Sequence, residues 1–256
     1  MNKQAENKMS DQGECKTAVQ ADNIVLQAKD LGRTFDPGIW TLRHLNLELE
    51  RGEFAAILGL SGSGKTTLFN ILAGLDKPDE GCVEVTEEIG YMMQKDLLLP
   101  WKRVISNIAL PLTMRGMTKR EAQAEVQKHL ADFGLEGLER RWPSQLSGGE
   151  RQRAALLRTY LYAGNILLLD EPFSGLDAIT RENMQTWLKE IKEQFRLTIL
   201  LITHDIDEAI ALTDTIHVLA PHHPASLHPP VIVTDRESTE LRSLIRRLLY
   251  TGIEQV

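Results

Sequence analysis

The sequence predicts an α/β fold: a mostly parallel sheet flanked by helices, with an antiparallel β subdomain and an inserted α-helical subdomain. Three short apolar runs, residues 54–58, 166–169 and 197–202, are typical of parallel strands that are buried on both faces. Residues 45–49 alternate leucine with polar side chains, as a half-buried strand does. Between residues 98 and 141 apolar side chains recur at helical spacing, which indicates an inserted group of helices.

Length and composition narrow the classes of function. The chain has 256 residues, of which 42% are hydrophobic and 25% charged, and these values are ordinary for a globular protein with one large core. A formal net charge of -7 disfavours a protein that coats nucleic acid, so we expect no nucleic-acid partner. No apolar run approaches the roughly 18 residues that cross a bilayer. A role at a membrane would therefore act through a partner.

The first 22 residues are polar and lack the apolar core of a secretory signal. We expect residues 1–22 to be a disordered leader and residues 23–256 to form the domain. The two cysteines, Cys15 and Cys82, have no metal-ligand spacing, and their number suits a reducing compartment. Cys82 is expected to be a small buried side chain in a strand.

Residues 59–67 read Gly-Leu-Ser-Gly-Ser-Gly-Lys-Thr-Thr, between the strand at 54–58 and a helix predicted at 66–73. Glycine permits the backbone torsions with which successive N–H groups surround a phosphate, and the helix dipole adds positive charge. Lys65 can then reach the β- and γ-phosphates, and the Thr66 hydroxyl can bind Mg²⁺. A Gly/Ser-rich turn with a chance lysine is the alternative, disfavoured because strand, loop, lysine and helix occur in the required order. The predicted nucleotide-binding residues are Gly59, Ser61, Gly62, Ser63, Gly64, Lys65, Thr66 and Thr67.

The helical insertion is predicted to span residues 98–143 and to divide the core into residues 23–97 and 144–220. Its helices are expected at 104–115 and 118–133, the second opening with a Thr118-to-Glu121 capping box.

A second glycine turn, Leu-Ser-Gly-Gly-Glu at residues 146–150, follows the insertion and opens a helix predicted at 151–162. Its N–H groups could bind an anion. In isolation, an ordinary turn and helix cap is the preferred interpretation.

Polar side chains follow two of the buried strands, at the edge where open α/β sheets bind ligands. Asp170 and Glu171 come directly after the strand at 166–169, and His204 follows the strand at 197–202. Neighbouring strand residues point in opposite directions, so the two carboxylates are expected to differ. One would bind Mg²⁺ through water, and the other would orient or deprotonate the attacking water. Solvated acids and a surface histidine are the structural alternative.

The remaining chain continues the alternation of helices and strands. A helix at 179–195, a helix at 206–212 and a strand at 216–219 complete the core, and residues 221–256 form a C-terminal extension. The three histidines of its connector at 221–230 fit no standard metal site. A final helix from Ser238 is expected to turn residues 241, 244, 245, 248 and 249 inward.

Together these motifs resemble the nucleotide-binding subunit of ATP-binding cassette (ABC) transporters, a family with a P-loop NTPase core. The resemblance covers residues 24–219, and the pentapeptide at 146–150 is its most discriminating motif. It implies that two copies pair head to tail and enclose ATP and Mg²⁺ between them. The roles it implies are Mg²⁺ binding for Thr66, Gln94 and Asp170; catalysis for Lys65, Gln94, Glu171 and His204; adenine stacking for Phe35, which could also be an ordinary packed side chain; and contact with the partner copy's nucleotide for Ser147, Gly148, Gly149 and Asp177.

A narrower resemblance, to importer subunits of the nitrate, sulfonate and taurine group, is carried by Tyr-Met-Met-Gln-Lys-Asp-Leu-Leu-Leu-Pro-Trp at residues 91–101. It implies that a transmembrane permease docks near Gln94 to Trp101, with Trp101 and residues 97–99 as an exposed anchor. The alternative is that these residues only cover the core of the helical insertion. An extracytoplasmic solute-binding protein would act indirectly, and the subunit would lie at the cytoplasmic face of the cell membrane. Residues 77–88 are shorter than in related subunits, which leaves the edge of the antiparallel sheet undefined.

Two other functions remain open from the sequence. A soluble, non-transport ABC ATPase with a role in translation, repair or regulation is one; such proteins often carry two cassettes, a long coiled coil or a basic extension, and none of these is visible in this sequence. A P-loop kinase would share the phosphate loop and the acidic strand end, but it leaves residues 146–150 unexplained.

Overall fold

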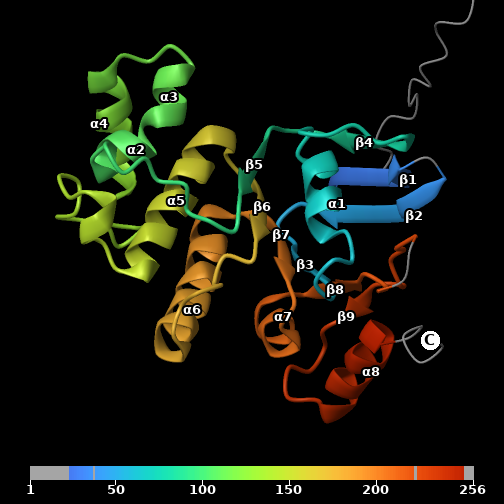
Figure 1. Cartoon of the computed structure of the whole chain (residues 1–256). Coiled ribbons are helices and arrows are strands. Elements are labelled where there is room, and N and C mark those ends of the chain that lie inside the picture. Colours follow the sequence, from blue (N-terminus) through green and yellow to red (C-terminus); the bar gives the residue numbers. More distant parts are fainter. Residues whose placement is uncertain (1–22, 37, 222–223, 251–256) are drawn as a thin grey trace, which may run out of the picture.

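A computed structural model describes residues 23–36, 38–221 and 224–250 (Figure 1). The leader expected at residues 1–22, together with His222 and His223 of the connector, lies outside the described residues. Within the described part of the chain, no helix is long and apolar enough to cross a membrane.

The central sheet has six strands in the order β5-β6-β7-β3-β8-β9, and all neighbours are parallel except the last pair. Every residue of β3, β6 and β7 is buried, as the three apolar runs predicted. The strands are β3 (Phe54–Leu58), β5 (Ile89–Met92), β6 (Ile166–Asp170), β7 (Thr198–Thr203), β8 (Thr215–Val218) and β9 (Val231–Ile232).

A second, antiparallel sheet has the order β2-β1-β4, formed by β1 (Ile24–Asp36), β2 (Ile39–Glu50) and β4 (Glu80–Val85). On β2, the leucines at positions 45, 47 and 49 are buried, and the polar residues between them are exposed. This alternation confirms the predicted half-buried strand. The short segment at 77–88 supplies β4, which pairs with β1 and forms one edge of the antiparallel sheet. Cys82 on this strand is half buried, so the expectation of a small buried side chain is wrong.

Two hydrophobic cores lie on opposite faces of the central sheet. Alternate residues of β3 and β7, such as Ile57 and Leu200, pack with the antiparallel sheet and α1 (Lys65–Leu72). The intervening residues, such as Leu58 and Leu201, pack with the helices on the other face. Those helices are α5 (Gly148–Ala163), α6 (Ala178–Phe195), α7 (Ile206–Leu212) and α8 (Thr239–Tyr250). The central sheet is thereby packed on both faces, and the carboxyl ends of its strands are held in place.

The insertion lies at one end of the molecule, beyond α5 (Figure 1). It contains α2 (Val104–Ile108), α3 (Leu110–Met114) and α4 (Lys119–His129), followed by a 3₁₀ turn, η1 (Pro143–Gln145). The single helix predicted at 104–115 is divided at Ala109, because Pro111 lies in the first turn of α3 and proline lacks the N–H that would continue the helix. The capping box of Thr118 and Glu121 is confirmed.

The C-terminal helix α8 differs from its prediction at one position. Ile245 and Leu249 are buried, but Leu244 is 42% exposed, so its predicted inward orientation is wrong. Arg242 Nε donates to Asp207 Oδ1 at 2.8 Å, which joins α8 to the first turn of α7.

His217 on β8 makes the stability of the fold depend on pH. Its side chain is 6% exposed, and burial lowers the pKa of the imidazole from 6.5 to about 4. Above pH 6.5 the imidazole is neutral in both the folded and unfolded states. Between pH 6.5 and about 4, only the unfolded state takes up the proton. The stabilisation is therefore present above pH 6.5 and lost as the pH falls toward 4.

We expect His217→Asn to remove this contribution. Urea unfolding at pH 7 and pH 5 should show that the wild type loses about 2 kcal/mol more stability than the variant between the two values. Equal losses in the two proteins would contradict a neutral buried imidazole.

Candidate nucleotide-binding site

The phosphate loop predicted at residues 59–67 joins the carboxyl end of β3 to α1. Gly62 and Gly64 have φ values of 80° and 94°, where a side chain is strained, and a Cβ on Gly64 would lie 2.9 Å from Leu42 Cδ2. The loop thus has the glycine-dependent backbone of a phosphate cradle. Gly59, Ser61, Gly62, Ser63 and Gly64 form the loop, and Lys65, Thr66 and Thr67 begin the helix.

Lys65 is buried and reaches back across this loop. Its Nζ donates to the carbonyl oxygens of Gly59 and Leu60, both at 2.8 Å. Burial lowers the pKa of the ammonium group, whereas the carboxylates of Glu171 and Asp170 act in the opposite direction. The ammonium group therefore lies between the loop and the two acids, where it can neutralise a bound phosphate.

Asp170 ends β6 and is 7% exposed. Burial raises the pKa of its carboxyl group, and the neighbouring charge of Glu171 raises it further. A hydrogen bond from Tyr91, the charge of Lys65 and a hydrogen bond from Thr66 oppose that rise. Asp170 is thus directed toward the phosphate loop and the start of α1.

Tyr91 is a site residue to which the sequence pattern assigned no role. Its Oη donates to Asp170 Oδ2 at 3.3 Å, and its ring packs edge-on against Phe69 of α1. Burial raises the pKa of the phenol, and the charge of Asp170 raises it further. Tyr91 therefore remains a hydrogen-bond donor at neutral pH. The available signal was its place on a strand three residues before Gln94, but which strand pairs with β6 is a tertiary property.

Glu171 lies where the ends of β5, β6 and β7 meet. Its φ of 43° is unusual for a residue other than glycine, and its N–H donates to Ile202 O at 3.0 Å. Glu171 Oε1 lies 3.1 Å from His204 Nδ1, and Gln94 Nε2 donates to Oε2 at 3.3 Å. The two adjacent acids therefore have different surroundings, as the sequence predicted.

Ser147, Gly148, Gly149 and Asp177 form a second group, at the starts of α5 and α6. Ser147 Oγ accepts a hydrogen bond from Glu150 N at 3.2 Å, and Ser147 N donates to Glu150 Oε2 at 2.6 Å. Asp177 accepts from Thr180 N at 3.0 Å, and this hydrogen bonding with Thr180 lowers the pKa of Asp177. A Cβ on Gly148 would lie 2.8 Å from Leu176, so the turn packs closely on the loop before α6.

The two groups are separate within one chain. A cavity beside the second group is lined by Gln94, Gly148 and Ser174, among others, and not by Lys65 or Asp170. Among the residues that the structure describes, no hydrogen bond or ion pair joins Ser147 to Lys65 or to Asp170.

Phe35 also lies away from the acids, on β1. It is 61% exposed, with the Arg33 guanidinium carbon 5.0 Å from its ring centroid. The ring is therefore at the surface and is not an ordinary core side chain.

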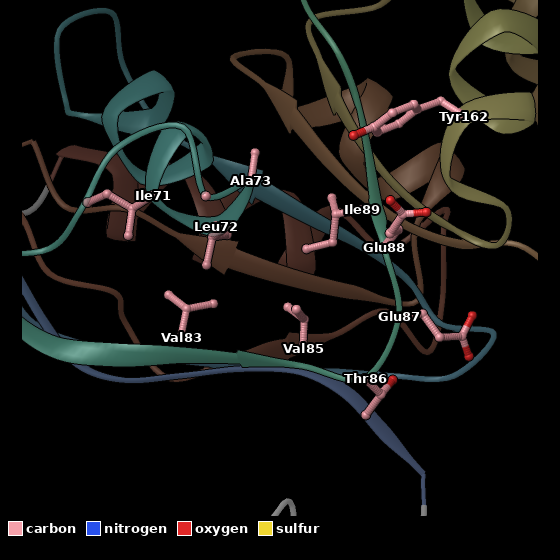
Figure 2. Close-up of a pocket in the computed structure, with 11 residues that line it drawn as sticks. Ile71, Leu72, Ala73, Val83, Val85, Thr86, Glu87, Glu88, Ile89 and Tyr162 are labelled. Carbon is pink, nitrogen blue, oxygen red and sulfur yellow. The ribbon is translucent and has the colours of Figure 1, made fainter. Parts of the chain in front are cut away.

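A different hollow, of about 550 Å³, lies between the end of α1, β4 and the segment that leads to β5 (Figure 2). Ile71, Leu72 and Val83 line it together with other apolar side chains, and Glu87 and Glu88 lie at its rim. Apolar walls beside two carboxylates do not suit a triphosphate. The candidate nucleotide site is therefore the open sheet edge at the phosphate loop.

The segment expected to receive a permease differs from its prediction at Leu98. Leu97 is 52% and Trp101 69% exposed, but Leu98 is 7% exposed and packs in the core, so residues 97–99 are not an exposed run. Leu97 belongs to an apolar groove between the core and the insertion, whereas Trp101 lines a separate hollow. The most exposed apolar residues of the groove are Leu75, Met93, Leu97, Met114 and Tyr162.

Comparison with known proteins identifies the family. Residues 42–174 match the family model described as ABC transporter. The aliphatic sulfonates import ATP-binding protein SsuB 2 of Rhodococcus jostii is 46% identical over 205 residues, which cover 79% of this chain and 81% of that protein. The chain belongs to the ABC transporter family. It is an ATP-binding subunit of an ABC transporter and hydrolyses ATP.

Two further comparisons place the cassette among its relatives. The formylaminopyrimidine import ATP-binding protein ThiZ of Halalkalibacterium halodurans is 42% identical over 225 residues, which cover 84% of this chain and 90% of that protein. The solved dimeric structure of the ATP-binding cassette MJ0796, in a post-hydrolysis state bound to ADP and Pi, is 29% identical. It has a TM-score of 0.69 and covers 82% of this chain and 99% of that one.

Proposed function

We propose that this ABC cassette is the energising subunit of an importer for aliphatic sulfonates or related small solutes. The observation that carries the proposal is the placement of Glu171 between His204 and Gln94, beside the buried lysine of the phosphate loop. Phosphoryl transfer depends on positioning and on charge neutralisation, and this arrangement supplies groups for both.

The residues at the sheet edge fit a Mg²⁺·ATP complex. Ser63 Oγ, within the loop that would hold the phosphates, is buried without a hydrogen-bond partner among the described residues. The hard oxygen donors of Thr66, Gln94 and Asp170 suit Mg²⁺ and would hold it, and the ion would supply positive charge that offsets the charge of the phosphates. Phe35 stacks on the adenine ring from the exposed end of β1.

Hydrolysis follows from the surroundings of Glu171. Its carboxylate accepts a proton from the water that attacks the γ-phosphorus, while Gln94 and His204 hold the carboxylate group in place. Lys65 stabilises the charge that develops on the transferred phosphoryl group. His204, with its side chain 61% exposed, is free to contact the γ-phosphate from the open side.

The second half of the site comes from another copy of the chain. Ser147, Gly148, Gly149 and Asp177 lie at two helix N-termini, where N–H groups and the helix dipole attract phosphate. Within the described residues, no hydrogen bond or ion pair joins Ser147 to Lys65 or Asp170, and the related cassette MJ0796 was solved as a dimer. Head-to-tail pairing would bring each group against the partner copy's nucleotide.

The groove lined by Met93, Leu97 and Met114 receives a cytoplasmic segment of a transmembrane permease. Exposed methionines and leucines of this kind are typical of surfaces that bind an apolar helix face. Docking there places the subunit at the cytoplasmic face of the cell membrane, with an extracytoplasmic solute-binding protein as an indirect partner.

The sulfonate assignment follows the names of the relatives. SsuB 2 and ThiZ are named for different solutes, although both are more than 40% identical to this chain. Selection of the solute therefore belongs to the permease and the binding protein. A soluble ATPase with no transported solute is the alternative function.

Replacement of Glu171 tests the assigned base. Glu171→Gln keeps the shape of the side chain and one acceptor oxygen for Gln94 Nε2, and we expect turnover to fall by about 100-fold or more because the proton acceptor is lost. ATP affinity should be unchanged, and size-exclusion chromatography should show an ATP-dependent dimer. Glu193→Gln, at an exposed position on α6, is the matched control. Normal turnover in Glu171→Gln would remove this assignment.

Purification from membranes separates transport from the soluble alternative. The tagged subunit should copurify with a multi-span membrane protein, and vesicles containing the complex should take up an alkanesulfonate when ATP is supplied on the subunit's side. Association with ribosomes or DNA in place of a membrane protein would overturn the importer assignment. Uptake of another solute only would leave the importer and exclude sulfonate.

A further inference from the structure

Two arginines of α5 hold the loop that follows Gln94. Arg158 Nη1 donates to Leu97 O at 2.9 Å, and its Nη2 donates to Asp96 O at 2.6 Å. Burial lowers the pKa of this guanidinium group, and the charge of Asp96 opposes that effect. A half-buried guanidinium that binds two successive carbonyls fixes the path of the loop.

The loop has a conformation that requires such support. Leu97 has a φ of 47°, an unfavourable value for a leucine, and its side chain is nevertheless 52% exposed. Asp96 Oδ1 accepts a hydrogen bond from Leu98 N at 3.0 Å, which tightens the same turn. Leu97 is thus held out into the groove by the bonds beneath it.

Arg151 connects this loop to the Ser147 turn. Its Nε lies 3.3 Å from Asp96 Oδ2, and its Nη1 donates to Leu146 O at 2.8 Å. Leu146 directly precedes Ser147, which caps α5. Arg151 and Arg158 are seven residues apart and lie on the same face of α5. A continuous series of polar contacts therefore runs from Leu97 to the residue before Ser147.

We propose that Asp96, Arg151 and Arg158 form a polar relay that couples occupancy of the groove at Leu97 to the position of the Ser147 turn. The inference rests on the proposed function, because it takes the groove as the permease site and Ser147 as the group that closes on the partner's ATP. Displacement of Leu97 by a bound helix moves Asp96, and Arg151 transmits the movement to Leu146. By reciprocity, closure on ATP changes the affinity of the groove for the permease.

The mechanical link can be tested in the isolated subunit. Arg158→Lys keeps the charge but cannot bind both carbonyls with a planar fork. Arg236→Lys is the matched control, because Arg236 donates to the carbonyls of Ile210 on α7 and of Thr213, which directly follows that helix. Amide hydrogen exchange should rise about fivefold or more at residues 96–98 and also at 147–151 in Arg158→Lys only.

Exchange that rises at residues 96–98 alone would overturn the relay, since the arginine would then support only its own loop. Asp96→Asn provides a second variant, which keeps the acceptor for Leu98 N but loses the ion pair with Arg151. It should raise exchange at residues 147–151 as well. Unchanged exchange there would equally overturn the relay.

The functional consequence is measured in the complex with the permease. Arg158→Lys should reduce the ratio of the permease-stimulated rate to the rate of the isolated variant about fivefold or more, relative to the same ratio for the wild type. Full stimulation of the variant would overturn the relay. A wild-type subunit that the permease does not stimulate would contradict the proposed function, and the exchange measurement would still decide the mechanical link.

Discussion

The burial of three parallel strands on both faces is the constraint on which the rest of the structure depends. β3, β6 and β7 are held between two hydrophobic cores, so their carboxyl ends cannot shift relative to one another. Each end delivers one component of the site: the phosphate loop after β3, Asp170 and Glu171 at the end of β6, and His204 after β7. Packing in the sheet thereby determines distances at the site.

The N-termini of α5 and α6 serve two purposes. Ser147 and Asp177 cap α5 and α6, and this local role alone explains their hydrogen bonds. The same geometry leaves helix N-termini with the positive potential that binds phosphate. A residue that stabilises its own helix can therefore also complete a site in another copy, provided that the turn is exposed.

Much of the fold could be predicted from the residue pattern because each element agrees with its local signals. The apolar runs of β3, β6 and β7 and the capping box of α4 were read directly from the sequence. The division of one predicted helix at Ala109 and the exposure of Leu244 were missed. Helical periodicity identifies an apolar face, but it does not show where a proline interrupts the helix or how much of that face is covered.

The candidate site was predictable as a set of motifs and less so as a geometry. Spacing placed Lys65, Asp170, Glu171 and His204 at one sheet edge, but the contact of Tyr91 with Asp170 depends on which strand lies beside β6. Leu98 was expected to be exposed as part of an anchor at residues 97–99, and tertiary packing buries it. Contacts between distant segments, including those of the arginine beneath Leu97, cannot be predicted from the spacing of residues along the chain.

We propose that each ATP site is built from two copies of the chain, and complementation between two inactive variants tests this. Subunits with Lys65→Met and subunits with Ser147→Arg should each be nearly inactive alone. In a mixed dimer, one site combines the intact Lys65 of one subunit with the intact Ser147 of the other. An equimolar mixture should therefore recover ATPase activity, about a quarter of the wild-type rate if pairing is random and the sites are independent. A mixture no more active than its separate components would contradict the shared site.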